Sequence, residues 1–301
     1  MVKKILLALM FVSCFAFAKQ ITIDVVTHGT DTDPFWNIIK NGINNAKKDM
    51  GVKVVYRNPS TGSLTQMARL IHSAVARRPD GLVVSVPDAD ALGPEIKRAI
   101  ALGIPVITIN AGEKFSKKAG ALMHVGQSEF NAGYQAGLKA KKAGVKTFMC
   151  INHEITNSSL EARCEGFAKA LGVKNNMLDV GKDPTNITQK VEPRLKGIDA
   201  VLVVGEIAAG PTARAIAKAG LKKHIFFVTF DLSKKILNLI QKGVIDFAID
   251  QQPYLQGYMP IVVLTQYIKY GVLPSGNINS GPGFITKANV ALVEKYAGKY
   301  R

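Results

Sequence analysis

The chain has 301 residues, 47% of them hydrophobic and 20% charged, which is typical of globular domains and excludes a disordered chain. Its formal net charge of +17 suggests an anionic partner. However, the lysines are scattered in pairs such as Lys47-Lys48 and Lys117-Lys118, and they never form a basic tract with interleaved aromatics. We therefore expect a solvated basic surface and no nucleic-acid partner.

The first 18 residues have the layout of a cleavable secretory signal peptide. Two lysines precede an apolar stretch from Ile5 to Phe17, which ends in the motif Ala16-Phe17-Ala18. This stretch is shorter than the about 20 apolar residues that a membrane span needs. The alternative is a lipoprotein signal in which Cys14 is lipidated, although the bulky Phe11 fits that motif poorly. We expect the mature protein to be exported to the periplasm.

Apolar, β-branched runs alternate with amphipathic helical patterns along the rest of the chain. Most runs are almost continuously hydrophobic, as expected for strands covered on both faces. Repeated strand–helix units of about 25 to 30 residues predict an α/β protein with doubly wound parallel sheets, and the length suggests two domains. The predicted strands are Ile21–Thr27, Val52–Tyr56, Gly81–Val86, Ile104–Ile109, Lys146–Ile151, Asp199–Val204, Ile225–Phe230 and Val244–Ile249.

Helix signals and one interruption set the predicted boundaries. Asp33 can cap a first helix that has Pro34 at its first position and ends at Gly51. A second helix is predicted from Leu64 to Arg77. The segment Glu113–Gly126 breaks the alternating pattern, so we expect the chain to cross between domains there.

Two cysteines remain in the mature chain. Cys150 ends a predicted strand and Cys164 follows on the next helix, so a disulfide is geometrically possible in an exported protein. The sequence does not decide between a disulfide and two buried thiols.

Motifs that would indicate catalysis are absent from the sequence. It contains no Gly-x-Ser-x-Gly elbow, no phosphate-binding Gly-rich loop and no His-Glu-x-x-His helix. The five histidines are dispersed, and the two mature cysteines lack the close pairing of a zinc site. We expect no metal, no cofactor and no enzymatic activity.

Polar and aromatic side chains gather at the carboxyl ends of predicted strands, where open α/β sheets bind ligands. Aromatic faces combined with carboxylate, amide and guanidinium groups suit the apolar faces and hydroxyl rims of sugars. The candidates are His28, Asp31, Asp33, Phe35 and Trp36 after the first strand, Asn110 after the fourth, Asp231 after the seventh, and Arg163 and Gln251.

Several candidates also have purely structural interpretations. Asp33 and Asp231 can serve only as helix caps, and Phe35 can fill the core face of its helix. Arg163 can be a solvated charge on a helix surface. The clustering of the candidates at strand ends favours ligand binding.

The order and spacing of six segments resemble a known family. These are Asp33-Pro34-Phe35-Trp36, residues 78–84 (RPDGLVV), residues 103–110 (GIPVITIN), residues 163–167 (RCEGF), Phe230-Asp231 and residues 250–258 (DQQPYLQGY). Over essentially the whole mature chain, the sequence resembles the periplasmic substrate-binding proteins of sugar ABC transporters, in the ribose-binding group of the type I fold.

The resemblance implies two lobes that close on a ligand, with three chain crossings near Gly126, Gln251 and Gly281. It implies an N-terminal lobe of residues 19–125 and 252–281 and a C-terminal lobe of residues 126–251 and 282–301. Phe35 and Trp36 match the family's ring-stacking aromatics. The others match polar contacts: Arg163 a guanidinium from the second lobe, Asp231 a hydroxyl-binding carboxylate and Gln251 a hinge-side amide.

Departures from the ribose binders indicate a different ligand. Asn110-Ala111 stands where ribose binders have an Asp-Arg pair, Val86 where they have Asn, and Gly205-Glu206 where they have Asn-Asp. With His28 and Asp31 gained nearby, we expect another aldose, a deoxysugar, a cyclitol or a furanosyl signal molecule. We expect the polar ring to consist of Asp33, Asn110, Arg163, Glu206 and Asp231.

The sequence thus predicts a monomeric solute binder that delivers a sugar or cyclitol to a membrane ABC permease. A sensory role, in which the liganded protein docks on a chemoreceptor, is compatible with the same residues. Repressors of the lactose type share the fold but need a helix-turn-helix where this chain has its signal peptide. A glycosidase using Asp31 and Asp231 is the third alternative, and it would need the two carboxylates about 5 to 10 Å apart.

Overall fold

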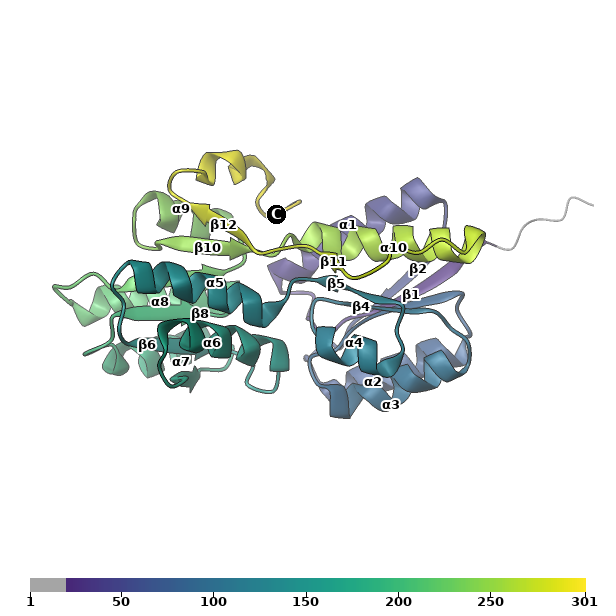
Figure 1. Ribbon diagram of the computed structural model, residues 1–301, viewed down its shortest axis with the longest axis horizontal. Coiled ribbons are helices and arrows are strands. Elements are labelled where there is room, and N and C mark those ends of the chain that lie inside the picture. The colour runs from purple at the N-terminus through teal and green to yellow at the C-terminus, as the bar shows by residue number, and fades with distance from the viewer. Residues whose placement is uncertain (1–19) are drawn as a thin grey trace, which may run out of the picture.

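The structure is a computed structural model, and it describes residues 20–301. The predicted signal peptide and Cys14 lie outside the described residues. Two lobes, each an open β-sheet flanked by helices, stand end to end (Figure 1). The predicted two-lobed α/β fold is confirmed.

The first lobe contains a six-stranded sheet in the order β11-β5-β4-β3-β1-β2, with every pair of neighbours parallel. Its strands are β1 (Thr22–Val26), β2 (Lys53–Arg57), β3 (Gly81–Ser85), β4 (Val106–Ile109), β5 (Met123–Gly126) and β11 (Ile278–Asn279). Its helices are α1 (Pro34–Met50), α2 (Leu64–Ala76), α3 (Ala89–Ala101), α4 (Glu113–Ala119) and α10 (Pro253–Tyr270).

The second lobe repeats this plan with the order β12-β10-β9-β8-β6-β7, in which only β10 and β12 are antiparallel. Its strands are β6 (Phe148–Asn152), β7 (Met177–Asp179), β8 (Ala200–Val203), β9 (Phe226–Phe230), β10 (Phe247–Asp250) and β12 (Gly283–Thr286). Its α-helices are α5 (Glu129–Lys142), α6 (Ser158–Leu171), α7 (Pro184–Val191), α8 (Glu206–Ala219) and α9 (Lys234–Gln241). Short 3₁₀ turns cover Glu192–Arg194, Val290–Leu292 and Glu294–Tyr296.

All eight strands expected from the sequence are present, with their ends displaced by a few residues. The central strands are buried on both faces, as their continuous hydrophobic character indicates. The first helix begins as expected, since the Asp33 side chain accepts a hydrogen bond from the Phe35 backbone N–H and Gly51 ends the helix at φ 66°. The second ends at Ala76, one residue before the expected Arg77, which caps it.

The segment Glu113–Gly126 lies in the first lobe, and the chain leaves that lobe at the end of the segment, next to Gly126. Residues 113–119 form α4, a short helix that a run of lysines and polar residues hides from hydrophobic periodicity, and Met123–Gly126 forms β5 of the first sheet. The chain leaves this sheet only after Gly126, where α5 begins the second lobe.

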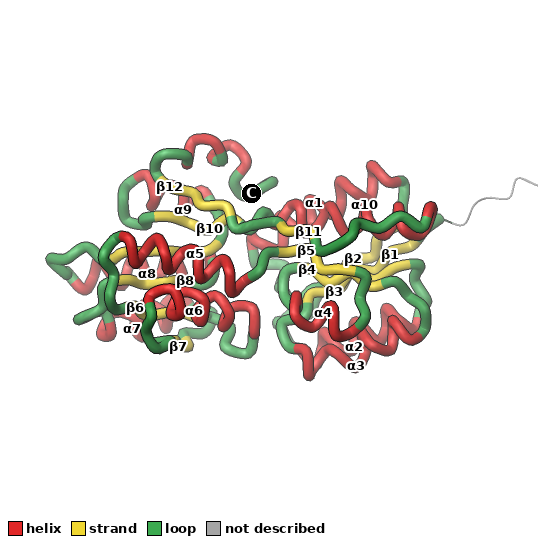
Figure 2. The backbone as a smooth tube through the Cα atoms, in the orientation of Figure 1, coloured by secondary structure: helices red, strands yellow, loops and turns green. Residues whose placement is uncertain are grey.

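Three passages connect the lobes where the chain runs from β5 to α5, from β10 to α10 and from β11 to β12 (Figure 2). They lie next to Gly126, Gln251 and Gly281. The last residues of the chain return to the first lobe, because Lys299 O accepts a hydrogen bond from Asn41 in α1 at 3.1 Å. Sheet membership alone does not define where a lobe ends, so the domain limits stay a prediction.

Two helix pairs cross at glycines, and these contacts set the walls of each lobe. In the first lobe, a Cβ on Gly257 of α10 would lie 2.1 Å from Ile39 O of α1. In the second lobe, a Cβ on Gly133 of α5 would lie 2.1 Å from Arg163 O of α6, and one on Gly166 would lie 2.1 Å from Phe130 O. Only glycine allows these backbones to approach so closely, and the α5–α6 contact fixes where Arg163 stands.

Cys150 and Cys164 form a disulfide, with their Cα atoms 5.7 Å apart. It links β6 to α6 in the interior of the second lobe. The structure therefore decides between the two possibilities that the sequence left open.

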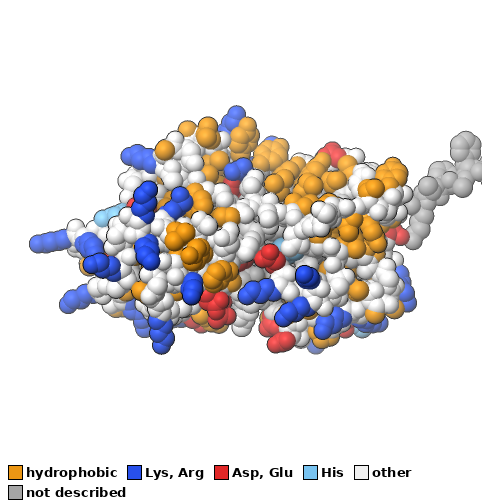
Figure 3. Space-filling model, in the orientation of Figure 1, with side chains coloured by type: hydrophobic (Ala, Val, Ile, Leu, Met, Phe, Trp, Pro, Cys, Tyr) orange, Lys and Arg blue, Asp and Glu red, His pale blue; other side chains and the backbone are white. Residues whose placement is uncertain are grey.

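Every helix within residues 20–301 is too short or too polar to cross a bilayer. On the face drawn in Figure 3, Lys and Arg side chains are spread over both lobes and do not gather in one continuous tract.

Candidate functional site

A small cavity of about 50 Å³ lies between the lobes, where the carboxyl ends of strands from both sheets meet. Residues of the first lobe, the second lobe and the hinge all line it. They are His28, Asp33, Phe35, Trp36, Asn110, His153, Glu154, Asn157, Leu160, Arg163, Val204, Gly205, Glu206, Ile207, Asp231 and Gln251.

Nine of the ten residues expected from the sequence line this cavity. The exception is Asp31, whose side chain is 76% exposed and pairs with Lys40 on the protein surface. Asp31 lies in the turn before α1, and that turn directs its carboxylate toward solvent. The same observation removes the carboxylate pair that a glycosidase using Asp31 and Asp231 would need.

The first lobe contributes an aromatic wall from the first turn of α1. Phe35 and Trp36 meet edge to face with their ring centroids 5.3 Å apart, and the His28 ring lies 4.8 Å from Trp36 in the same geometry. Both aromatic rings also belong to the core of the first lobe. Asp33 likewise has two roles in the fold, since it caps α1 at 3.0 Å and lines the cavity. The structural and the ligand-binding interpretations are therefore compatible.

The second lobe contributes a guanidinium that is held in place from three sides. Arg163 donates from Nε and Nη2 to the two carboxylate oxygens of Glu129 at 2.6 and 2.9 Å, and from Nη1 to Val204 O at 2.6 Å. Its guanidinium also lies over the Phe230 ring, 4.1 Å from the centroid. Only 2% of Arg163 is exposed, so the interpretation as a solvated helix charge is wrong.

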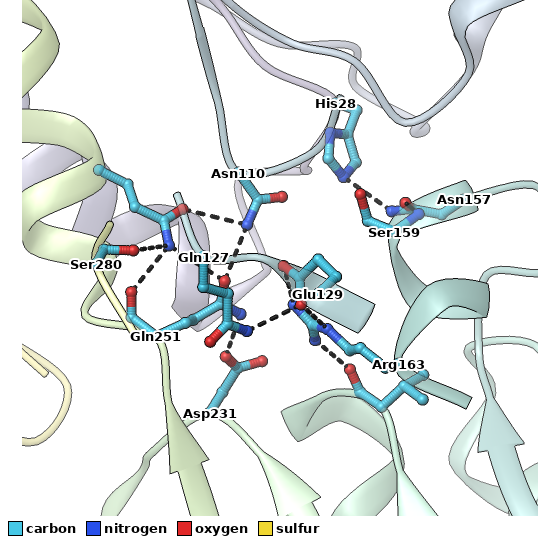
Figure 4. Close-up of polar contacts among 12 residues, drawn as sticks. His28, Asn110, Gln127, Glu129, Asn157, Ser159, Arg163, Asp231, Gln251 and Ser280 are labelled. Carbon is cyan, nitrogen blue, oxygen red and sulfur yellow. Dashed lines mark hydrogen bonds and ion pairs between the residues drawn. The ribbon is translucent and has the colours of Figure 1, made fainter. Parts of the chain in front are cut away.

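A chain of side-chain amides connects the hinge to the cavity (Figure 4). Gln251 donates to Asp231 Oδ1 at 2.6 Å and accepts from Asn110 Nδ2 at 3.2 Å. Gln256 donates to the Gln251 backbone oxygen at 2.9 Å and to Ser280 Oγ at 3.1 Å. Gln251 and Ser280, which lie at two of the crossings, therefore belong to one hydrogen-bond network with the cavity residues Asn110 and Asp231.

Asn110 and Asp231 both adopt left-handed backbone conformations, at φ 60° and 71°. Non-glycine residues adopt this region rarely, and Asn and Asp tolerate it best. Asp231 does not cap the helix that follows, because Ser233 is the residue that caps α9. The structural interpretation of Asp231 as a cap is therefore wrong.

The lobes touch directly along one side of the cavity. Ser158 at the start of α6 donates its backbone N–H and its hydroxyl to Pro87 O, at 3.1 and 3.0 Å. Asn157 Nδ2 lies 3.4 Å from His28 Nε2. These contacts join the two lobes across one side of the cavity.

Burial changes the protonation of the groups that face the cavity. It raises the pKa of Asp231 to about 7, and the neighbouring carboxyls Glu206 and Asp33 add to this effect, whereas Arg163 and the hydrogen bond from Gln251 oppose it. Burial also raises the pKa of Asp33 to about 6 and raises the pKa of Glu206. In contrast, burial lowers the pKa of His28 and that of His153 to about 4, so both rings are neutral at pH 7.

Sequence reasoning missed several residues of the second lobe. His153, Glu154 and Asn157 line the cavity from the loop after β6, and Glu129 supports Arg163 from α5. The strand-end rule that identified His28 and Asn110 also applies to His153 and Glu154, which follow a predicted strand directly. Nothing in the sequence indicates the role of Glu129, because its contact with Arg163 depends on how two helices pack.

Within residues 20–301, no three His, Cys, Asp or Glu side chains are arranged to hold a metal ion. The cavity instead offers carboxylates, amides and a guanidinium beside aromatic faces. Such a set can bind a ligand through several hydrogen bonds at once.

Curated proteins that resemble the chain are solute-binding proteins. It is 25% identical to the xylose/arabinose-binding protein XylF of Sulfolobus acidocaldarius over 300 residues, which cover 91% of this chain and 73% of that protein. It is 24% identical to the ribose import binding protein RbsB of Haemophilus influenzae over 261 residues, which cover 84% and 87% of the two chains.

A solved structure gives a stronger match. The carbohydrate transporter of Acidothermus cellulolyticus 11B, in complex with myo-inositol, superimposes with a TM-score of 0.87 at 36% identity and covers 93% of this chain and 98% of that chain. The family model described as a periplasmic binding protein domain matches residues 23–271. The chain therefore belongs to the periplasmic binding protein family, a family of binders and not of enzymes.

Proposed function

We propose that this protein is the solute-binding component of an ABC uptake system and that it captures one cyclitol or monosaccharide between its lobes. The observation that carries the proposal is the composition of the cavity. An aromatic wall from α1 faces a fixed guanidinium and two carboxyls of the second lobe, which suits a ring with apolar faces and a polar rim. The ligand would lie against Phe35 and Trp36.

The relatives support this ligand class. The structural relative with 36% identity holds myo-inositol, whereas the ribose and xylose/arabinose binders are 24 to 26% identical. Asn110 and Ala111 replace the Asp-Arg pair of ribose binders, which also argues against ribose. A cyclitol or an aldose other than ribose fits both observations.

The proposal includes a location and a partner. The signal-like residues 1–18 and the family's periplasmic members support export to the periplasm. A membrane permease would receive the ligand when the lobes open. Closure of the lobes over the ligand would distinguish the loaded from the empty protein for that permease.

A thermal-shift screen of aldoses, deoxysugars, cyclitols and nucleosides tests the proposal. A ligand present at 100 times its Kd stabilises the folded protein by about 2.7 kcal/mol, which raises Tm by several degrees. We expect at least one cyclitol or monosaccharide to do so, and no nucleoside. A screen in which no cyclitol or monosaccharide changes Tm would overturn the proposal.

Titration calorimetry of variants then tests the site. Arg163→Ala and Asp231→Ala should each weaken binding at least tenfold, since each removes a charged hydrogen-bonding group from the cavity. Asp31→Ala is the matched control, because Asp31 follows the same strand as Asp33 but lies on the surface. Circular dichroism before titration separates lost binding from lost folding. Near-wild-type affinity in both cavity variants would reject the assigned site.

A further inference from the structure

The positive charge in the cavity is already neutralised by the protein itself. Among residues 20–301, Arg163 is the one Lys or Arg side chain that lines the cavity, and both oxygens of Glu129 accept from its guanidinium. Burial opposes the charge of Arg163, but Glu129 outweighs burial and raises the Arg163 pKa. The pair carries no net charge, and although Arg163 also lowers the pKa of Asp231, burial and the neighbouring carboxyls outweigh this effect.

Three other titratable groups that line the cavity, Glu154, His28 and His153, also add no net charge to it. Glu154 forms an ion pair with Lys182 at 3.2 Å. The His28 and His153 rings are neutral at pH 7, as described above. His153 Nδ1 is buried and has no hydrogen-bond partner within residues 20–301, so a ligand N–H or O–H could satisfy it.

Three further carboxyls of the cavity have no such partner. Among residues 20–301, no Lys, Arg or His nitrogen lies within 4.0 Å of Asp33, Glu206 or Asp231. Asp33 accepts only from the Phe35 backbone, and Asp231 accepts from the uncharged Gln251 amide. Lys40 and Lys182 act on Asp33, Lys235 acts on Glu206 and Arg163 acts on Asp231, in each case from more than 4.0 Å away.

These three carboxyls also repel one another. Asp33 and Glu206 both raise the pKa of Asp231, and Asp33 raises that of Glu206, in each case in addition to the effect of burial. Buried carboxylates without a counter-charge destabilise a protein. A closed cavity of this kind favours an occupant that brings positive charge.

We propose that the natural ligand is a cationic polyol, a cyclitol or sugar in which an amine replaces at least one hydroxyl, with its ammonium held among Asp33, Glu206 and Asp231. An ammonium offers three donors, and its hydrogen bonds to carboxylates are about twice as strong as those of neutral groups. The adjacent aromatic wall can add a cation–π contact. This inference rests on the proposed function, because it specifies the substrate class of the same cavity.

Calorimetry with matched ligand pairs at pH 7 tests the inference. The probes are myo-inositol with a monoamino-inositol, and D-glucose with D-glucosamine; N-acetyl-D-glucosamine keeps the nitrogen but removes its charge. In at least one pair, we expect the amine to bind at least about tenfold more tightly than its hydroxyl parent. The N-acetyl compound, which carries no charge, should not bind more tightly than the hydroxyl parent.

The carboxyl variants identify the source of the preference. Glu206→Gln, Asp33→Asn and Asp231→Asn conserve shape and remove one charge each, so each should reduce the advantage of the amine at least threefold. Asp31→Asn is the control, and it should leave the affinity for both members of a pair unchanged.

The outcomes separate this inference from the proposed function. If the hydroxyl parents bind as tightly as the amines or more tightly, the cationic ligand is wrong and the proposed function stands. If the advantage of the amine persists in all three carboxyl variants, the assignment to these carboxyls is wrong. If nothing in either series binds, the inference fails, whereas the proposed function fails only if the wider thermal-shift screen also finds no cyclitol or monosaccharide that binds.

Discussion

Arg163 on α6 and Glu129 on α5 form a buried, two-pronged ion pair, with N–O distances of 2.6 and 2.9 Å. Glu129 Oε2 also accepts from Gln127 Nε2 at 2.9 Å, so the pair is connected to the first crossing of the hinge. A ligand-facing guanidinium thus depends on a residue that does not line the cavity itself.

Glu129→Gln should destabilise the protein by about 3 kcal/mol or more, because it leaves the buried guanidinium of Arg163 without a counter-charge. The measurement is the denaturant midpoint at pH 7. Glu161→Gln, an exposed change on α6, is the control and should alter stability by less than about 0.5 kcal/mol. The double variant Glu129→Gln/Arg163→Met should recover much of the loss, and a double variant less stable than Glu129→Gln would contradict this account.

Gly29→Ala should weaken ligand binding at least tenfold while the protein still folds. A Cβ at this position would lie 1.8 Å from Trp36 Cδ1, so the indole must move away from the cavity wall. Calorimetry with the ligand found in the screen measures the loss, and circular dichroism checks folding. Gly276→Ala is the matched control, because a Cβ there meets nothing within 4 Å. Unchanged affinity in Gly29→Ala would show that the position of Trp36 does not matter.

Much of the fold could be predicted because hydrophobic character reports burial directly. The eight long strands are nearly continuous apolar runs, and each is present. Four strands were missed. Met177–Asp179, Ile278–Asn279 and Gly283–Thr286 are short and lie at sheet edges, and Met123–Gly126 is buried but has only four residues. Such strands exist because a neighbouring strand offers its edge, which is a tertiary effect without a periodic signal.

Part of the site could be predicted from positions in the chain that determine a position in space. Strand ends are such positions, and they gave His28, Asn110 and Asp231. Asp31 also follows the first strand, but the turn before α1 directs it outward, which spacing does not reveal. The partnership of Glu129 with Arg163 depends on helix contacts made possible by Gly133 and Gly166, and no local pattern encodes such a contact.

Removing the disulfide with Cys150→Ala/Cys164→Ala should lower the free energy of unfolding by about 3 kcal/mol, as expected for a loop of this length. Guanidinium unfolding measures the change. A reductant should lower the midpoint of the wild type and leave the double variant unaffected. A wild-type midpoint that is insensitive to reductant, even with prolonged incubation at denaturing concentrations, would argue against the bridge in solution.

Asp231→Asn should stabilise the unliganded protein increasingly as the pH rises. The folded state holds the Asp231 proton up to about pH 7, whereas the unfolded chain releases it near its ordinary pKa of 3.8. Between these values the folded state binds more protons, so the contribution of Asp231 to stability is present at low pH and is lost as the pH rises through 7. Asn resembles the protonated acid, and because it does not titrate, its contribution to stability does not change with pH.

The difference in unfolding free energy between Asp231→Asn and wild type should therefore grow by on the order of 2 kcal/mol from pH 5.5 to pH 8. His28 and His153, whose pKa values are lowered, act in the opposite direction below pH 6.5, but they are present in both proteins and largely cancel in the difference. Asp31→Asn should show no such trend, because the Lys40 contact lowers the Asp31 pKa and its titration ends below this range. A constant difference between Asp231→Asn and wild type across the range would mean that Asp231 is already ionised at pH 5.5. The cavity would then tolerate its negative charge without help from a proton or a cationic ligand.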